Sequence, residues 1–137
     1  MLADGSWFVG DQPAAHDLAL RYLKARLVFQ GEGAFVVDGA RRLPVRVEGP
    51  PFEVLRIALD PVRGEARALL DDGSEETLRD GSLWMDEASG RFECAARSGV
   101  TRAFFSRAAH QTLLANAEEE DGQFYLRVGP RRVSIRA

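Results

Sequence analysis

Cysteine, histidine and lysine are scarce in this sequence. Its 137 residues include one cysteine, Cys94, two histidines and a single lysine, Lys24. One cysteine excludes an intramolecular disulfide framework, and one cysteine with two histidines cannot form a thiolate-rich metal cage. Cys94 shares a strand face with Phe92 and Ala96, so we expect a buried, unreactive thiol. We expect neither a metal ion nor a cofactor.

Long hydrophobic runs are also missing. None approaches the roughly 18 residues that a membrane-spanning helix needs, and the first residues lack the basic and apolar regions of a signal peptide. Hydrophobic residues make up 45% of the chain and charged residues 28%, as is usual in soluble globular proteins. We therefore expect a cytoplasmic protein without a membrane partner, long enough for a sizeable core.

An excess of positive charge is absent as well. The 18 basic and 21 acidic residues give a net charge of −3, which argues against nucleic acid as the main partner, because such binding neutralises many phosphates. A glycine-rich phosphate loop is not present either. The segment 31–33, Gly-Glu-Gly, precedes a predicted strand, whereas a nucleotide-binding loop is followed by a helix.

Two amphipathic helices are predicted from apolar residues at spacings of three and four. The first covers about 14–29 and follows Asp-Gln-Pro, which suits a helix start. The second region covers about 101–117, as a short turn and then a longer helix that Ser106 caps. The acidic run 118–121 lies at the wrong end of a helix for the macrodipole, so we expect a solvated loop, with a metal site as the alternative.

Alternating patterns predict antiparallel strands around these helices. A hairpin through Asp38-Gly39 spans about 35–47, and 52–59 is apolar on both faces, as in a central strand. A further hairpin is predicted around Gly90. The last hairpin covers 124–136, and four of its residues are expected to point into the core: Phe124, Leu126, Val133 and Ile135.

Two similar stretches indicate an internal repeat. Residues 4–9, DGSWFV, and 80–85, DGSLWM, contain the only tryptophans, and each precedes a helix and then a hairpin with two arginines after its turn. We predict an α+β fold of two repeated units, 1–60 and 61–137, each with a helix packed on a small antiparallel sheet. The second unit carries the additional hairpin, and the two form one globule. The alternative is that Asp-Gly turns simply recur in such proteins.

The aromatic residues and the prolines near them are interpreted as structural. A tryptophan at the start of each unit is more typical of a core or interface anchor than of a platform on which a base stacks. The expected core or interface anchors are Trp7, Trp84, Pro51 and Phe52.

Residues suited to hydrolytic catalysis occur without a recognisable catalytic motif. His110 follows Ser106 by four residues, which would place both side chains on one helix face, but no nucleophile elbow surrounds the serine. The paired carboxylates at 71–72 and 75–76 lie in polar, turn-rich sequence. We predict no catalytic residue, and a small hydrolase is the minor alternative.

Arginines on the two main hairpins form the most suggestive charge pattern. Arg42 and Arg46 lie on the polar face of the first hairpin, and Arg127, Arg132 and Arg136 lie on that of the last. If the two faces met across a cleft, their guanidinium groups would form an anion-binding groove suited to phosphate or carboxylate. The alternative is that both are ordinary solvated sheet faces.

Four motifs in order along the chain resemble those of a known family. They are DGSW at 4–7, VEGPPF at 47–52, Ser106-Arg107 leading to Leu113-Leu114, and DGQFYL at 121–126. With them the chain resembles, over nearly its whole length, a bacterial family of domains of unknown function, DUF1285. The resemblance implies a duplicated α+β fold whose C-terminal half is similar to pleckstrin-homology-like folds. It also implies a site for a nucleotide-like ligand between the halves and a part in signalling.

The same resemblance points to the helix starts. Members of that family have an arginine at the start of each helix, and here Arg107 occupies the second position while His16 occupies the first. Backbone N–H groups and the macrodipole at helix N-termini favour anions. The chain is shorter than typical members, with trimmed connections in its second half.

These observations predict a cytoplasmic, non-enzymatic ligand-binding or regulatory module. Its small anionic ligand would lie between the repeats, held by Arg107, His16 and the hairpin arginines Arg42, Arg46 and Arg132. The alternative is a protein-protein interaction domain without a small-molecule ligand, which would dock a partner through hairpin edges and the region of Phe104 and Phe105.

Overall fold

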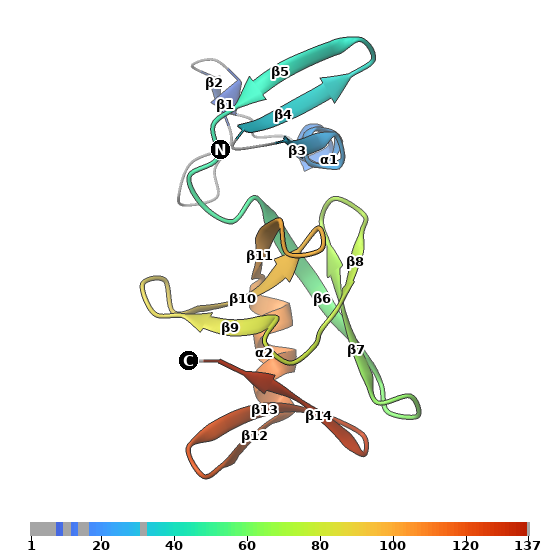
Figure 1. Cartoon of the computed structure of the whole chain (residues 1–137), viewed down its shortest axis with the longest axis vertical. Coiled ribbons are helices and arrows are strands. Elements are labelled where there is room, and N and C mark those ends of the chain that lie inside the picture. The colour runs from blue at the N-terminus through green and yellow to red at the C-terminus, as the bar shows by residue number, and fades with distance from the viewer. Residues whose placement is uncertain (1–7, 10–11, 14–16, 31–32, 137) are drawn as a thin grey trace.

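The computed structural model describes residues 8–9, 12–13, 17–30 and 33–136, in which strands predominate (Figure 1). In chain order the elements are β1 (Phe8–Val9), β2 (Gln12–Pro13), α1 (Asp17–Ala25), β3 (Leu27–Gln30), β4 (Gly33–Asp38), β5 (Arg41–Val45), β6 (Phe52–Asp60), β7 (Glu65–Leu70), β8 (Glu75–Thr77), β9 (Leu83–Asp86), β10 (Arg91–Ala96), β11 (Thr101–Phe105), α2 (Arg107–Ala115), β12 (Ala117–Glu120), β13 (Gln123–Val128) and β14 (Arg131–Ile135). The predicted mixture of helices and antiparallel sheets is confirmed, but the described chain is mostly β-structure with two helices.

Six strands form the central sheet, in the order β8-β7-β6-β11-β10-β9. Its pairings are antiparallel except that of β6 with β11, which is parallel and places Ala103 opposite Phe52 and Phe105 opposite Val54. Phe52 and Val54 are fully buried, as predicted for a central strand. The sequence pattern assigned this strand to the N-terminal unit, 1–60, whereas β6 pairs with strands that follow residue 60.

The last three strands continue the central sheet past its edge strand β9. β12, β13 and β14 form an antiparallel sheet, and a bridge between Trp84 and Arg136 joins its end to β9. The N–H of Met85 donates to the carbonyl of Arg136 (2.9 Å), and the N–H of Arg136 donates to the carbonyl of Leu83 (3.0 Å). α2 packs on β6 and β11 and runs from β11 toward the last sheet (Figure 1). The prediction that each helix covers a small sheet of its own unit is not confirmed, because α2 packs on β6 and β11 of the central sheet.

α1 with the sheet β3-β4-β5 has the same order of elements as α2 with β12-β13-β14. The helices begin at residues 17 and 107, and the strands begin at 27 and 117, 33 and 123, and 41 and 131, so each spacing is 90 residues. A backbone hydrogen bond recurs at the same spacing. The N–H of Val37 donates to the carbonyl of Arg26 (3.0 Å), and the N–H of Arg127 donates to the carbonyl of Asn116 (2.8 Å).

Two short strands directly after the helices differ from the predictions. The first helix ends at Ala25, and the segment 27–30 is the strand β3. The acidic run that we predicted as a loop forms β12 and the turn after it, because Glu118 receives two hydrogen bonds of 2.9 Å from the Arg127 guanidinium on the neighbouring strand. Neither strand is set off from its helix by a glycine or proline, which are the signals on which sequence prediction depends.

The segment 101–105 was predicted as a helical turn and is the strand β11. Ala103 and Phe105 face the core, while Arg102 is exposed, which is the period-two pattern of a strand. The run is only five residues long and ends directly at the cap of α2, so its alternation is easily read as the start of the helix.

Buried apolar residues form one cluster that extends from β3 and β4 to the last sheet. Phe52 is fully buried in it and Pro51 is also fully buried, whereas Trp84 is only partly buried, and Trp7 lies outside the described residues. Leu126, Val133 and Ile135 point inward as predicted, but Phe124 is 46% exposed, contrary to the prediction. Neither of the two described helices has the length and apolar character needed to cross a membrane.

Two glycines at equivalent turns provide a matched test of the packing. Gly39 and Gly129 both have positive φ, 60° and 58°, but a Cβ on Gly129 would lie 2.3 Å from the Pro61 carbonyl oxygen, and one on Gly39 would meet nothing within 4 Å. We expect Gly39→Ala to cost about 1 kcal/mol, because L-residues disfavour this conformation. Gly129→Ala should cost about 2 kcal/mol more, because the turn after β6 must move. Urea unfolding of both variants measures the difference, and equal losses would contradict the contact.

Candidate functional site

The structure places the predicted hairpin arginines at separate parts of the molecule. Arg42 on β5 lies 4.7 Å from the ring centroid of Phe35 and donates to Gln30. Arg132 on β14 lies 4.0 Å from the ring centroid of Tyr125 and pairs with Glu120 on the adjacent strand. Figure 1 shows β5 and β14 at opposite ends of the molecule. These two arginines therefore do not face each other across a cleft.

The remaining predicted ligand-binding residues are also dispersed. Arg46 follows β5 and pairs with Glu48. Arg107 is the exposed first residue of α2 and makes no hydrogen bond or ion pair with another described residue. His16 lies outside the described residues.

From here on, the N-terminal unit means α1 with the sheet β3-β4-β5. It meets the central sheet at a polar seam, which we define by Lys24, Asp71, Asp72 and Arg97. Lys24, the only lysine, is 6% exposed and pairs with Asp71. Asp71 also accepts a hydrogen bond from the Glu53 N–H (2.9 Å), which orients its carboxylate toward the helix. A buried pair of this kind stabilises only when both charges remain matched.

Arg97 is the second connection across the seam. Its guanidinium donates to the Leu27 carbonyl (2.9 Å) of the N-terminal unit and to Asp72 (2.8 Å) of the central sheet, and it lies 4.8 Å from the ring centroid of Phe52. Its backbone has a φ of 52°, an unfavourable value for a residue with a side chain. The N–H of Arg97 donates to Glu76 (2.8 Å), which helps to hold this conformation.

The seam contains a cleft of about 270 Å³ that corresponds to the predicted ligand site between the units. Its lining residues are Leu20, Arg21, Lys24, Glu53, Leu55, Asp71 and Phe104. Two carboxylates balance the two cations there, and Lys24 is already paired with Asp71. The cleft therefore offers little net attraction for an anion.

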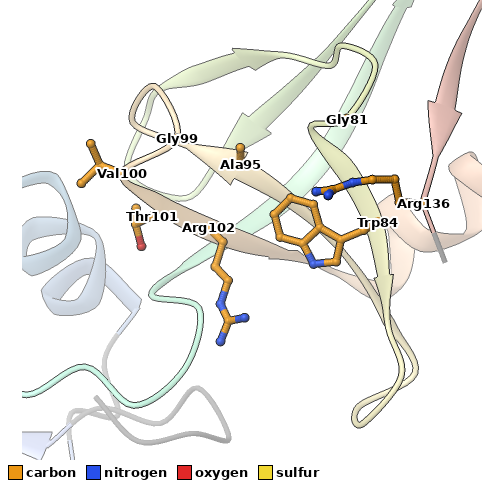
Figure 2. Close-up of a pocket in the computed structure, with 8 residues that line it drawn as sticks. All are labelled: Gly81, Trp84, Ala95, Gly99, Val100, Thr101, Arg102 and Arg136. Atoms are coloured by element: carbon orange, nitrogen blue, oxygen red, sulfur yellow. The ribbon is translucent and has the colours of Figure 1, made fainter.

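A groove of about 490 Å³ has a lining better suited to an anion, and we call it the Trp84 groove. Figure 2 shows its residues, which are Gly81, Trp84, Ala95, Gly99, Val100, Thr101, Arg102 and Arg136. Trp84, Ala95 and Arg102 share the face of β9, β10 and β11 that is opposite to the buried Leu83 and Cys94. Among the described residues, two arginines and no carboxylate line this groove.

Glu93 on β10 positions the aromatic and cationic parts of the groove. Its side chain is 2% exposed, a rare state for a carboxylate, and one oxygen accepts a hydrogen bond from the Trp84 indole N–H (3.3 Å). The same oxygen lies 3.5 Å from the Arg102 guanidinium. A single buried charge therefore holds both the indole and the guanidinium in place.

Arg136 supplies the second cation. Its guanidinium carbon is 5.3 Å from the Trp84 ring centroid, and Figure 2 shows its side chain extending over the indole. Its backbone is fixed to β9 by the bridge to Trp84. Arg136 has no carboxylate partner among the described residues, so its charge is available to a ligand. The sum of Arg102, Arg136 and Glu93 is one net positive charge beside an aromatic face, which suits a planar anion.

The sequence prediction missed Arg102 and assigned Arg136 only to the polar face of the last hairpin. Arg102 was overlooked because β11 was interpreted as a helical turn. One signal was present in the sequence: Glu93 stands between Phe92 and Cys94 in an apolar strand. A carboxylate at such a position needs a nearby cation or donor, and it could have drawn attention to this sheet face.

The residues considered for catalysis have structural roles. Ser106 caps α2 by accepting from the Ala109 N–H (3.2 Å) and donates its hydroxyl to the Leu55 carbonyl (3.1 Å), while the His110 ring packs against Phe92 with centroids 4.9 Å apart. No group of three or more potential metal ligands of the His, Cys, Asp and Glu types occurs in the described part of the chain. Cys94 is fully buried, and burial raises the pKa of its thiol to about 12, with Glu76 and Glu93 adding to the effect.

The region predicted as a docking surface is largely covered. Phe105 is 3% exposed and belongs to the core. Phe104 is partly buried beneath the Arg91 guanidinium, which lies 4.3 Å from its ring centroid.

Comparison with known proteins identifies the fold. No family model matches the chain, and no curated protein matches it. A DUF1285 family protein of Silicibacter pomeroyi DSS-3 superposes with a TM-score of 0.70 at 19% identity, over 95% of this chain and 74% of that one. A DUF1285 family protein of Shewanella baltica OS155 superposes with a TM-score of 0.61 at 11% identity, over 81% of this chain and 85% of that one. The chain therefore has a DUF1285-like fold, in agreement with the resemblance of its motifs.

The pKa of Asp72 allows a prediction of how the stability of the seam depends on pH. Burial raises the pKa of this carboxyl, but hydrogen bonds from Ser74 and Arg97 outweigh burial and lower it overall. A lowered pKa in the folded state means that ionised Asp72 stabilises the protein above the unfolded pKa of about 4, and that this contribution disappears as the pH falls through the folded pKa.

We expect Asp72→Asn to unfold at lower urea concentration than the wild type at pH 7, and to lose less stability between pH 5 and pH 3. The control is Glu87→Gln, since Glu87 is exposed and makes no hydrogen bond or ion pair with a described residue. Its pH dependence should match the wild type. A variant at Asp72 that loses stability on acidification as steeply as the wild type would contradict the assigned role.

The burial of Cys94 leads to a prediction about the alkylation of its thiol. Because the thiol is buried and its pKa is about 12, the thiolate is scarce at pH 8, and iodoacetamide should not modify the native protein. Modification should become rapid in urea, where the thiol is exposed. Mass spectrometry of native and denatured samples measures both states, and rapid modification of the native protein would show that Cys94 is accessible.

Proposed function

We propose that the protein is a cytoplasmic, non-enzymatic ligand-binding or regulatory module, and that its small anionic ligand binds in the Trp84 groove. The observation that carries the proposal is the position of Arg136, a cation over an indole with no carboxylate partner among the described residues. Arg102 lies on the same groove and is oriented by the buried Glu93.

The groove favours a ligand with a planar, conjugated part. The Trp84 ring forms an aromatic wall, and small residues at Gly81, Ala95 and Gly99 leave room beside it. Guanidinium groups bind carboxylates and phosphates with paired donors, and aromatic rings stack on an indole. Aromatic carboxylates and nucleotide-like molecules have both features. This site differs from the predicted one, which placed the ligand between the units and among the hairpin arginines.

The groove and the seam share one turn, which supports a regulatory role. The turn between β10 and β11 contains Arg97, which contacts the N-terminal unit, and Gly99 and Val100, which line the groove. A ligand that contacts this turn and binds more tightly when the N-terminal unit is docked would stabilise the docked state, because the two sites share the same few residues. A role in signalling belongs to this proposal.

The proposal includes an internal duplication of the helix-and-three-strand unit. Its support is the constant spacing of 90 residues and the repeated arrangement of an arginine over a ring, Arg42 on Phe35 and Arg132 on Tyr125. Most of the Trp84 groove belongs to β9, β10, β11 and the turns beside them, which lie between the two units, and the end of the second unit contributes Arg136.

Calorimetry with adenosine monophosphate, benzoate and inorganic phosphate tests the site. We expect the wild type to bind at least one of the first two more tightly than phosphate, because only they have a ring that can stack on Trp84. Arg136→Ala should weaken that binding about tenfold, which corresponds to about 1.4 kcal/mol. Arg102→Lys keeps a charge near Glu93 but loses the planar donors, and it should also weaken binding.

Arg63→Ala is the matched control, because Arg63 is an exposed arginine between β6 and β7 and does not line the groove. It should bind as the wild type does. Failure of the wild type to bind any of the three probes, or binding that neither groove variant changes, would refute the site. A partner protein that the wild type and Arg136→Ala retain equally would favour the alternative, a protein-protein interaction domain.

A further inference from the structure

Side chains, and not strand pairing, join the N-terminal unit to the central sheet. Within the described part of the chain, no strand of β3-β4-β5 pairs with a strand of the central sheet. The hydrogen bonds that cross the seam there come from two cations. Lys24 donates to Asp71, and Arg97 donates to the carbonyls of Leu27 (2.9 Å) and Lys24 (3.4 Å). The chain itself crosses through the segment 46–51, which forms neither helix nor strand.

The carboxylates of the seam are held in place by the central sheet alone. Asp71 accepts from the Glu53 N–H (2.9 Å), and Asp72 accepts from the Ser74 N–H (2.9 Å). Lys24, which is 6% exposed, is the one charged side chain that the N-terminal unit adds. Burial of an ammonium group is tolerated only beside its counter-charge, so closure of the seam depends on the contact of Lys24 with Asp71. We call this pair the latch.

Other contacts tie α1 to the sheet of its own unit. The N–H of Val37 on β4 donates to the carbonyl of Arg26 at the end of the helix (3.0 Å), and the Tyr22 hydroxyl donates to Asp38 (2.9 Å). Neither hydrogen bond crosses the seam, so opening of the latch leaves both intact. α1 and β3-β4-β5 can therefore move together about the segment 46–51.

The closed seam balances a strained turn against a small apolar contact. Arg97 and Ser98 both have positive φ, 52° and 57°, which residues with a side chain disfavour. Opening releases the Arg97 side chain from Leu27, so this turn can relax. The rings of Phe29 and Phe52, with centroids 6.4 Å apart, favour the closed state. Interfaces between units of one chain allow relative motion unless they are large and hydrophobic.

We propose that the N-terminal unit opens and closes on the central sheet as one body, with the pair of Lys24 and Asp71 as the latch. The central sheet stays folded when the latch opens. Opening separates the ring of Phe29 from that of Phe52 and exposes the Lys24 ammonium group to water. This motion needs no ligand in the Trp84 groove, so the inference goes beyond the proposed function and does not rest on it.

The single lysine and the single cysteine are chemical probes on the two sides of the seam. An acetylating N-hydroxysuccinimide ester labels Lys24, iodoacetamide labels Cys94, and mass spectrometry of peptides separates Lys24 from the N-terminal amine. The protection of each residue is its rate of modification in the urea-unfolded chain divided by its rate in the native protein. We expect Lys24 to be protected at least about tenfold less than Cys94, because opening exposes only Lys24. Equal protection of the two residues would overturn the inference, since the seam would then open only by global unfolding.

Asp71→Asn tests the latch, because the amide keeps an acceptor for the Glu53 N–H but loses the charge that holds Lys24. It should lower the protection of Lys24 more than about tenfold and that of Cys94 much less. Glu75→Gln is the matched control with the same change of charge, since Glu75 forms an exposed ion pair with Arg67 in the same sheet. Both of its protections should equal those of the wild type. An unchanged ratio of the two protections in Asp71→Asn would contradict the role of the latch.

Tyr22→Phe distinguishes motion of the whole unit from unravelling of α1. It removes the hydrogen bond to Asp38 and should leave the protection of Lys24 as in the wild type. Lower protection in this variant would show that α1 leaves its own sheet, and the inference would be wrong. Arg136→Ala should keep both protections, so loss of the proposed ligand site and loss of the latch are measured separately.

Discussion

The parallel pairing of β6 with β11 is the constraint on which the rest of the structure depends. It joins two antiparallel parts of the central sheet, and β7 to β10 form the long connection that parallel neighbours require. The ladder passes directly into α2, because the N–H of Ser106 donates to the Val54 carbonyl (3.0 Å) and its side chain caps the helix. This pairing positions Arg102 in the groove and Phe104 in the seam.

Charge is distributed differently at the seam and at the Trp84 groove. The seam is neutral, since Lys24 pairs with Asp71 and Arg97 pairs with Asp72. The Trp84 groove has an excess of positive charge, because Glu93 can neutralise only one of its two arginines. Burial raises the energy of unmatched charge, so the buried cations of the seam are paired, whereas Arg136 at the groove has no carboxylate partner among the described residues.

The sequence predicted the kinds of element better than their exact extent or use. Ser106 as a helix cap, β6 as a central strand and the Asp38-Gly39 hairpin followed from local chemistry. β3 and β12 were missed, because each is a four-residue strand that follows its helix without a breaking residue. The hairpin arginines were predicted from a polar sheet face alone. That pattern does not show whether an arginine is already paired with a carboxylate, and Arg132 forms an ion pair with Glu120 on its own sheet.

Local sequence alone determined the turns, the helix cap and the alternation of most strands. These properties depend on residues close together in the chain, and their geometry requires little else. The tertiary structure decided which arginines have a carboxylate partner and which do not. Arg136 meets Trp84 only because the end of β14 bridges to β9 across 52 positions of sequence, from residue 84 to residue 136. Such a contact depends on the packing of the whole sheet around α2, so no local pattern could have indicated it.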